Sequence, residues 1–276
     1  MLLKLVLLFG VVLLVGAIGL RVRLEQPLLL LRWPGLALRA AMGMYVALPA
    51  VVLLLVWWMP LRPGVGAVLL GFAVSPVLPP WAKKGVALGG QDDIVIGLQV
   101  LSSAVSILVV PLMIGIAQRL FGVETSLNPF AVERVLLVTV LVPLALGLGA
   151  GRLWPSAAPQ LAARLDLVGG VVVLLGALVL LIDRGPAILG AFGQGTLMAI
   201  VAVVAIGLLL GYGLGGPDPG NRAVLASAMV SRHPAIALLL ANGAFPQRDA
   251  TVMGAALLYL LVALVLPLPL ERRRRP

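Results

Sequence analysis

The sequence is divided into long apolar stretches joined by short polar connections, and this division limits the fold more than any other feature. An α-helix needs about 20 apolar residues to cross the hydrocarbon core of a bilayer. Hydrophobic residues make up 62% of the 276-residue chain and charged residues 11%, whereas soluble domains are about half apolar and about a quarter charged. We count nine such stretches, at residues 2–20, 36–58, 64–80, 94–118, 135–153, 166–182, 193–215, 222–241 and 251–270. The sequence therefore predicts an all-α polytopic membrane protein with about nine transmembrane helices.

The composition also excludes several classes of function. The chain has no cysteine and one histidine, His233, which removes thiol chemistry and argues against a metal site. The net charge of +10 comes from basic residues in short loops and in the tail Arg272–Arg275, not from a nucleic-acid-binding module. No catalytic triad or carboxylate pair can be assembled within a span. We therefore predict no enzyme activity, no resident cofactor and no nucleic-acid partner.

The distribution of lysine and arginine predicts an orientation in the membrane. Basic residues accumulate on the cytoplasmic side of membrane proteins. With the loop after the first stretch in the cytoplasm, thirteen basic residues lie on that side and six on the other. We therefore expect the N-terminus outside and the basic tail, residues 271–276, in the cytoplasm. A signal peptide is the alternative for residues 1–20, but the weak small-residue site around Gly16 and Ala17 favours a retained helix.

Two of the apolar stretches are interrupted by proline and basic residues. Arg232, His233 and Pro234 lie inside the stretch Ala223–Ala241, and the run Ser75–Lys84 begins within the third stretch and extends beyond its end. Charge and broken backbone at membrane depth are tolerated where they face protein or a water-filled cavity. The predicted helix breaks are Pro76, Pro79, Pro80 and Pro234. Two broken segments, one in each half of a chain, indicate the central site of a transporter. The plainer alternative is a kinked helix whose Arg232 snorkels or is paired.

Other polar residues are candidates for the same site. Gln99, Ser102, Ser103 and Ser106 fall on one face of a helix by their spacing. That face either makes interhelical hydrogen bonds or lines a site opposite Arg232. Lys83 and Lys84 either assist Arg232 or belong to an ordinary cytoplasmic loop.

Two glycine clusters, Gly147–Gly151 and Gly211–Gly216, are not phosphate-binding loops, because no lysine followed by serine or threonine comes after them. Close packing of helices explains these glycines better.

At the two broken segments the sequence resembles the bile acid:sodium symporter superfamily, as a divergent bacterial member. Val105–Pro111 is similar to a serine- and threonine-rich helix of the family that ends in proline, and Ser231–Ala237 is similar to its second crossover motif. The resemblance implies inverted repeats with two crossing, discontinuous helices. It further implies a panel, residues 1–20 and 132–182, and a core, residues 36–120 and 193–270.

The chain departs from this family at the residues that matter for sodium. Arg232 and His233 stand at the positions of a glutamine and an asparagine, and no acid lies in the second motif. We therefore expect a secondary transporter that moves a small organic anion across the bacterial inner membrane by alternating access, with sodium absent from the site. The expected substrate-binding residues are Arg232, His233, Ser231, Lys83, Lys84, Gln99, Ser103 and Ser106. An ordinary sodium and organic anion symporter is the first alternative, and a membrane-embedded lipid-modifying enzyme is the second.

Overall fold

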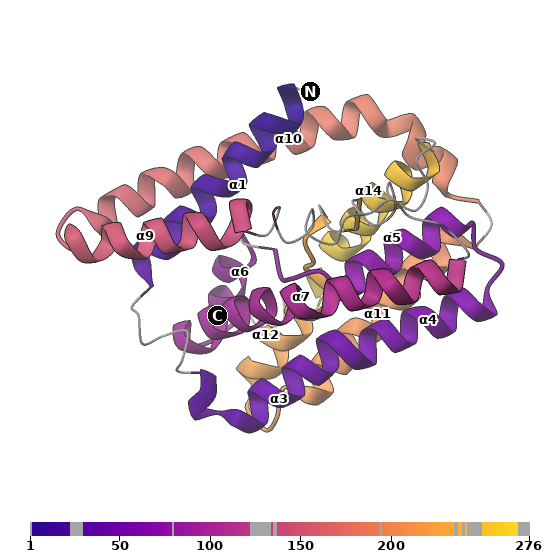
Figure 1. The fold of residues 1–276 in the computed structure, drawn as a ribbon, viewed down its shortest axis with the longest axis horizontal. Helices are drawn as coiled ribbons and strands as arrows, with labels where there is room; N and C mark the ends of the chain where they lie inside the picture. Colours follow the sequence, from indigo (N-terminus) through magenta and orange to yellow (C-terminus); the bar gives the residue numbers. More distant parts are fainter. Residues whose placement is uncertain are drawn as a thin grey trace.

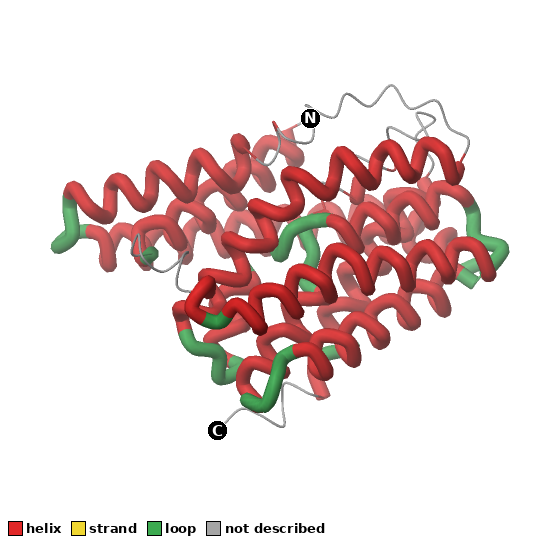
Figure 2. The backbone as a smooth tube through the Cα atoms, turned by 60° about the horizontal axis from the view of Figure 1, so that its bottom comes forward, coloured by secondary structure: helices red, strands yellow, loops and turns green. Residues whose placement is uncertain are grey.

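A computed structural model describes residues 2–22, 30–78, 80–121, 134, 137–193, 195–234, 237–238, 241 and 250–269. Across these residues the regular structure is helical, apart from one antiparallel bridge between Val77 and Arg232 (Figure 2). The predicted all-α class is therefore confirmed. Four described segments are long and apolar enough to cross a membrane: Pro34–Trp58, Asp92–Met113, Ala158–Ala191 and Thr196–Leu214. Shorter apolar helices accompany them, so the chain has the helices of a membrane protein. The number of nine spans stays a prediction, and the basic tail lies outside the described residues.

The helices follow the predicted apolar stretches closely. In chain order they are α1 (Leu2–Arg21), η1 (Leu30–Arg32), α3 (Pro34–Met42), η2 (Gly43–Ala47), α4 (Leu48–Trp58), α5 (Pro63–Val74), α6 (Trp81–Ala87), α7 (Asp92–Phe121), η3 (Leu137–Leu141), α9 (Val142–Leu153), α10 (Ala158–Ala191), α11 (Thr196–Leu214), α12 (Pro219–Val230) and α14 (Ala250–Val265). The prediction for residues 166–182 was too short, because α10 spans 34 residues.

Three helices end earlier than predicted, and a proline follows each end within four residues. α5 stops at Val74, α12 at Val230 and α14 at Val265, whereas the apolar stretches continue to residues 80, 241 and 270. A proline disfavours helical conformation at the residue before it. Ser75, which precedes Pro76, is extended with φ −71° and ψ 154°. Ser231, with φ −85° and ψ 72°, has also left the helix.

The helices form two groups that differ in their packing partners. α1 lies against α9 and the first part of α10, whereas α14 lies against the last part of α10 and against α5 and α11 (Figure 1). The broken helices are the most enclosed: residues 64–77 and 224–230 are buried throughout. The chain therefore places its two interruptions at the centre of the second group.

Glycines let several of these helices approach to backbone contact. A Cβ on Gly147 would lie 2.3 Å from the carbonyl oxygen of Gly16, and one on Gly211 would lie 2.5 Å from the Cα of Ala226. Gly151 and Gly215 are similarly close to the backbone of α1 and α12. The predicted packing role therefore holds at these positions. It is wrong for Gly149 and Gly213, because no atom of a described neighbouring segment lies within 4 Å of a Cβ there.

Candidate functional site

The two interrupted segments cross and pair with each other through their backbones. The amide of Leu78 donates to the carbonyl of Ser231 at 2.9 Å, and the amide of His233 donates to the carbonyl of Pro76 at 2.9 Å. A buried polar backbone group without a partner costs several kcal/mol in an apolar medium. This pairing therefore satisfies groups that the broken helices leave open. We call residues 75–78 together with 231–233 the crossing.

Arg232 is buried at the crossing and joins three segments of the chain. Its side chain is 1% exposed, so the alternative in which it snorkels toward the membrane surface is wrong. Nε donates to the carbonyl of Met229 at 2.9 Å, Nη1 to that of Ser75 at 2.8 Å and Nη2 to that of Met44 at 3.3 Å. The guanidinium carbon lies 5.7 Å from the centroid of the Tyr45 ring. The side chain thus fastens both broken helices to η2.

The charge of this guanidinium is met by carbonyl dipoles and an aromatic face. Among the described residues, no carboxylate lies within ion-pair distance of Arg232. A buried charge ordinarily has a partner of opposite sign, because desolvation costs several kcal/mol per ion. Among the described groups, three backbone carbonyls and the Tyr45 ring are therefore the partners of this buried charge.

The polar face of α7 contacts the first broken segment. The side-chain amide of Gln99 donates to the carbonyl of Val77 at 2.6 Å, and the amide of Val77 donates to Oγ of Ser102 at 3.2 Å. The hydroxyls of Ser103 and Ser106 donate to carbonyls of their own helix, at 2.9 and 2.8 Å. Gln99 and Ser102 therefore make the interhelical bonds that the spacing allowed. Oε1 of Gln99 is buried and accepts no hydrogen bond from the described residues.

The end of α12 is braced from two sides. Pro234 has no amide hydrogen to donate to the carbonyl of Val230 four residues earlier. This carbonyl instead accepts from the amide of Arg232 at 3.0 Å and from the hydroxyl of Tyr259 at 3.4 Å. The Tyr259 ring stacks on Phe72 of α5 with centroids 3.9 Å apart. His233 is 5% exposed beside this brace, and Ser231 is partly buried.

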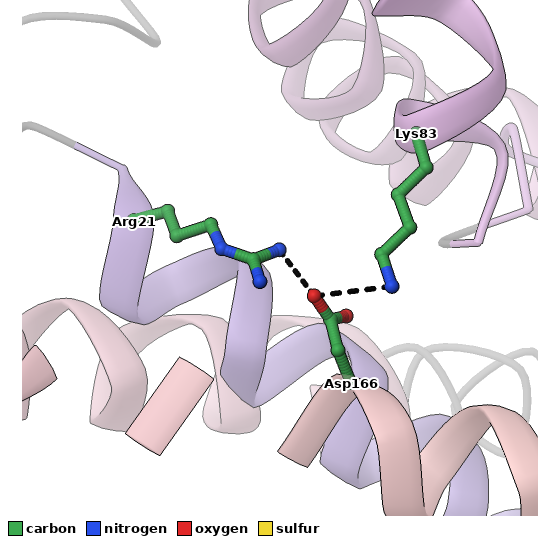
Figure 3. Close-up of polar contacts among 3 residues, drawn as sticks. All are labelled: Arg21, Lys83 and Asp166. Carbon is green, nitrogen blue, oxygen red and sulfur yellow. Dashed lines mark ion pairs between the residues drawn. The ribbon is translucent and has the colours of Figure 1, made fainter. Parts of the chain in front are cut away.

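The structure does not bring Lys83 to Arg232. Lys83 lies on α6, and its Nζ is 3.1 Å from Oδ2 of Asp166 on α10. Arg21, at the end of α1, pairs with the same oxygen (Figure 3). The prediction that Lys83 assists Arg232 directly is therefore wrong in this conformation, because the buried carboxylate of Asp166 holds its ammonium group. Lys84 is partly buried on the same helix.

The predicted helix breaks at Pro76 and Pro234 border the extended parts of the crossing, and Pro80 precedes the first residue of α6. Pro79 lies outside the described residues.

Two residues at the crossing and one away from it escaped the sequence analysis. Tyr45 contacts Arg232 and donates to the carbonyl of Ser102 at 2.5 Å, and Tyr259 braces α12. Asp166 carries the ion pairs. Asp166 had a usable signal, since an acid at the start of an apolar stretch marks a functional or paired position. The two tyrosines had no sequence signal apart from a hydroxyl group within an apolar stretch.

No protein-family model matches the chain, and no curated protein matches it either. The function is therefore argued from the geometry of the crossing.

Proposed function

We propose that this protein is a secondary active transporter that moves an organic anion across a membrane by alternating access. One observation carries the proposal: the guanidinium of Arg232 is buried where two broken helices cross, and no carboxylate of the described residues neutralises it. Ionisable residues within membrane proteins line substrate pathways, and crossing discontinuous helices hold substrates near the midplane. The proposed location is the bacterial inner membrane, with the N-terminus outside and the C-terminus in the cytoplasm.

The proposed substrate carries a negative group that is drawn to Arg232. Gln99 and Arg232 bind neighbouring carbonyls of the first broken segment, those of Val77 and Ser75, and Oε1 of Gln99 is buried without a hydrogen bond from the described residues. We propose that this oxygen accepts from a hydroxyl or N–H group of the substrate. Ser231, His233, Ser103 and Ser106 complete the proposed site.

Transport by this site does not require sodium. A sodium ion needs several oxygen ligands, and unwound carbonyls supply them at broken helices. Here the carbonyls of Ser75, Met229 and Met44 already accept from the guanidinium. The guanidinium of Arg232 therefore takes the carbonyl oxygens that a sodium ion would need as ligands. A sodium symporter remains the alternative that the experiment below separates.

The alternating movement would occur between the two helix groups. The proposed panel contains α1, α9 and α10, and the proposed core contains the crossing with α3 to α7, α11, α12 and α14. Because Arg232 is 1% exposed, an anion can reach it only after these groups part or the crossing opens. The family resemblance supports this division.

Thermal unfolding of the purified protein tests the proposal. We expect at least one organic anion to raise the Tm by several degrees and to do so equally as its sodium and potassium salts, since a ligand of the folded state stabilises by mass action. Chloride salts of equal ionic strength are the control. A rise that appears only in sodium would establish symport instead, and no rise with any anion would count against an anion site.

A further inference from the structure

A second cluster of charges lies away from the crossing, where α1, α6 and α10 meet. The carboxylate of Asp166 receives Nη1 of Arg21 and Nζ of Lys83 on the same oxygen, Oδ2 (Figure 3). We call Arg21 and Lys83 the two-cation cluster. Among the described residues, the two cations share one carboxylate, so Asp166 alone does not neutralise the cluster.

Burial is unequal within this group. The side chain of Asp166 is 6% exposed, whereas those of Arg21 and Lys83 are 43% and 58% exposed. The two cations can therefore be approached from outside the protein while the carboxylate between them is shielded. This contrasts with the pair of Asp183 and Arg184 on the same helix, where both partners are more than half exposed and are joined at 2.9 Å.

The cluster joins helices that otherwise pack with different neighbours. α6 lies against α7 and α12, and α10 lies against α1 and α14. Arg21 and Asp166 therefore belong to one helix group and Lys83 to the other. Lys83 lies three residues after Pro80, at the exit of the first broken segment, whose Ser75 carbonyl accepts from Arg232.

We infer that the two-cation cluster is a second anion site, selective for carboxylates, and that Asp166 is the internal carboxylate that fills it at rest. An arriving carboxylate would take over Lys83 from Asp166. The ammonium group of Lys83 would keep an anionic partner, while the ion pair that links α6 to α10 would be broken. Displacement would thereby couple arrival of the substrate to separation of the two helix groups.

The chemistry of the cluster defines the ligand class. Its resident partner is a carboxylate, which the guanidinium of Arg21 and the ammonium of Lys83 hold as ion pairs. The role in transport rests on the proposed function, whereas binding of a free carboxylate at this cluster does not. The two can therefore fail separately.

Replacement of the internal carboxylate by a free one tests the inference. In Asp166→Ala the cluster loses its acid and gains space, so we expect potassium acetate between about 10 and 100 mM to raise the Tm by a few degrees over potassium chloride. The matched control is Asp183→Ala, which removes one acid from the same helix and should respond to acetate no more than the wild type. Adding Lys83→Gln to Asp166→Ala should abolish the acetate effect.

Asp166→Ser, which also removes the carboxylate and leaves room for acetate, takes the place of Asp166→Ala if the latter does not fold. With either variant, an acetate effect no larger than that of the matched Asp183 variant overturns the inference. An effect that persists without Lys83 overturns it as well. Loss of transport with acetate binding intact would instead count against the proposed function alone.

Discussion

Replacing Arg232 by glutamine is expected to weaken anion binding at least about tenfold. Hydrogen bonds to a charged group contribute about 1.5–3 kcal/mol, and about 1.4 kcal/mol corresponds to a factor of ten. Arg232→Lys keeps the charge, so its affinity should fall between those of the wild type and Arg232→Gln. Titration of the Tm with the stabilising anion measures all three affinities. Arg152→Gln, an exposed position at the end of α9, is the control for the loss of one positive charge.

The same substitutions separate charge from structure. The guanidinium fork serves three carbonyls, and lysine has no fork of that shape. We therefore expect Arg232→Lys to lower the Tm without ligand while anion binding is partly retained. Loss of the carbonyl partners in Arg232→Gln is offset in part by removal of a buried charge. If Arg232→Gln binds the anion as tightly as the wild type, the role of Arg232 is only structural and the proposed function is wrong.

The second large effect is expected at Gly211, where α11 contacts α12. A Cβ there would lie 2.5 Å from the Cα of Ala226 and 2.7 Å from its backbone nitrogen, and neither atom belongs to a flexible side chain. Overpacking of a tight interface costs about 1–3 kcal/mol or more. Gly211→Ala should therefore lower the Tm by several degrees and also displace the helix that ends at the crossing.

Gly213 on the same helix provides the matched control. In the part of the chain that the structure describes, no neighbouring atom lies within 4 Å of a Cβ at this position, so Gly213→Ala adds a methyl group without a close contact. Alanine is favoured over glycine in helices by about 1 kcal/mol, and the Tm should stay unchanged or rise. If both variants lower the Tm equally, Gly211 is not needed for the close approach of α11 and α12.

The positions of the helices could be predicted because apolar stretches have a length and a composition that the bilayer dictates. Their ends at the crossing could not be placed by hydropathy, since apolar residues resume after each break, at Val77 and Leu78 and again at residues 235–241. Pro76 and Pro234 indicated the breaks, yet proline alone does not say how many residues become extended.

Arg232 could be singled out because a charge at membrane depth is costly. Its partners could not be, because they are backbone carbonyls of Met229, Ser75 and Met44, and a carbonyl is present at every residue. The partner of Lys83 was missed for a different reason. Asp166 is distant in sequence, and nothing in the local pattern of either residue indicates that α6 meets α10.

Uptake into sodium-free proteoliposomes tests the central claim most directly. The protein is reconstituted in potassium buffer, and accumulation of the anion that raises the Tm is measured for the wild type and for Arg232→Gln. The account predicts uptake by the wild type at the same rate with potassium as with sodium, and uptake reduced at least about tenfold in Arg232→Gln. Uptake that occurs only with sodium, or that is equal in both proteins, would contradict it.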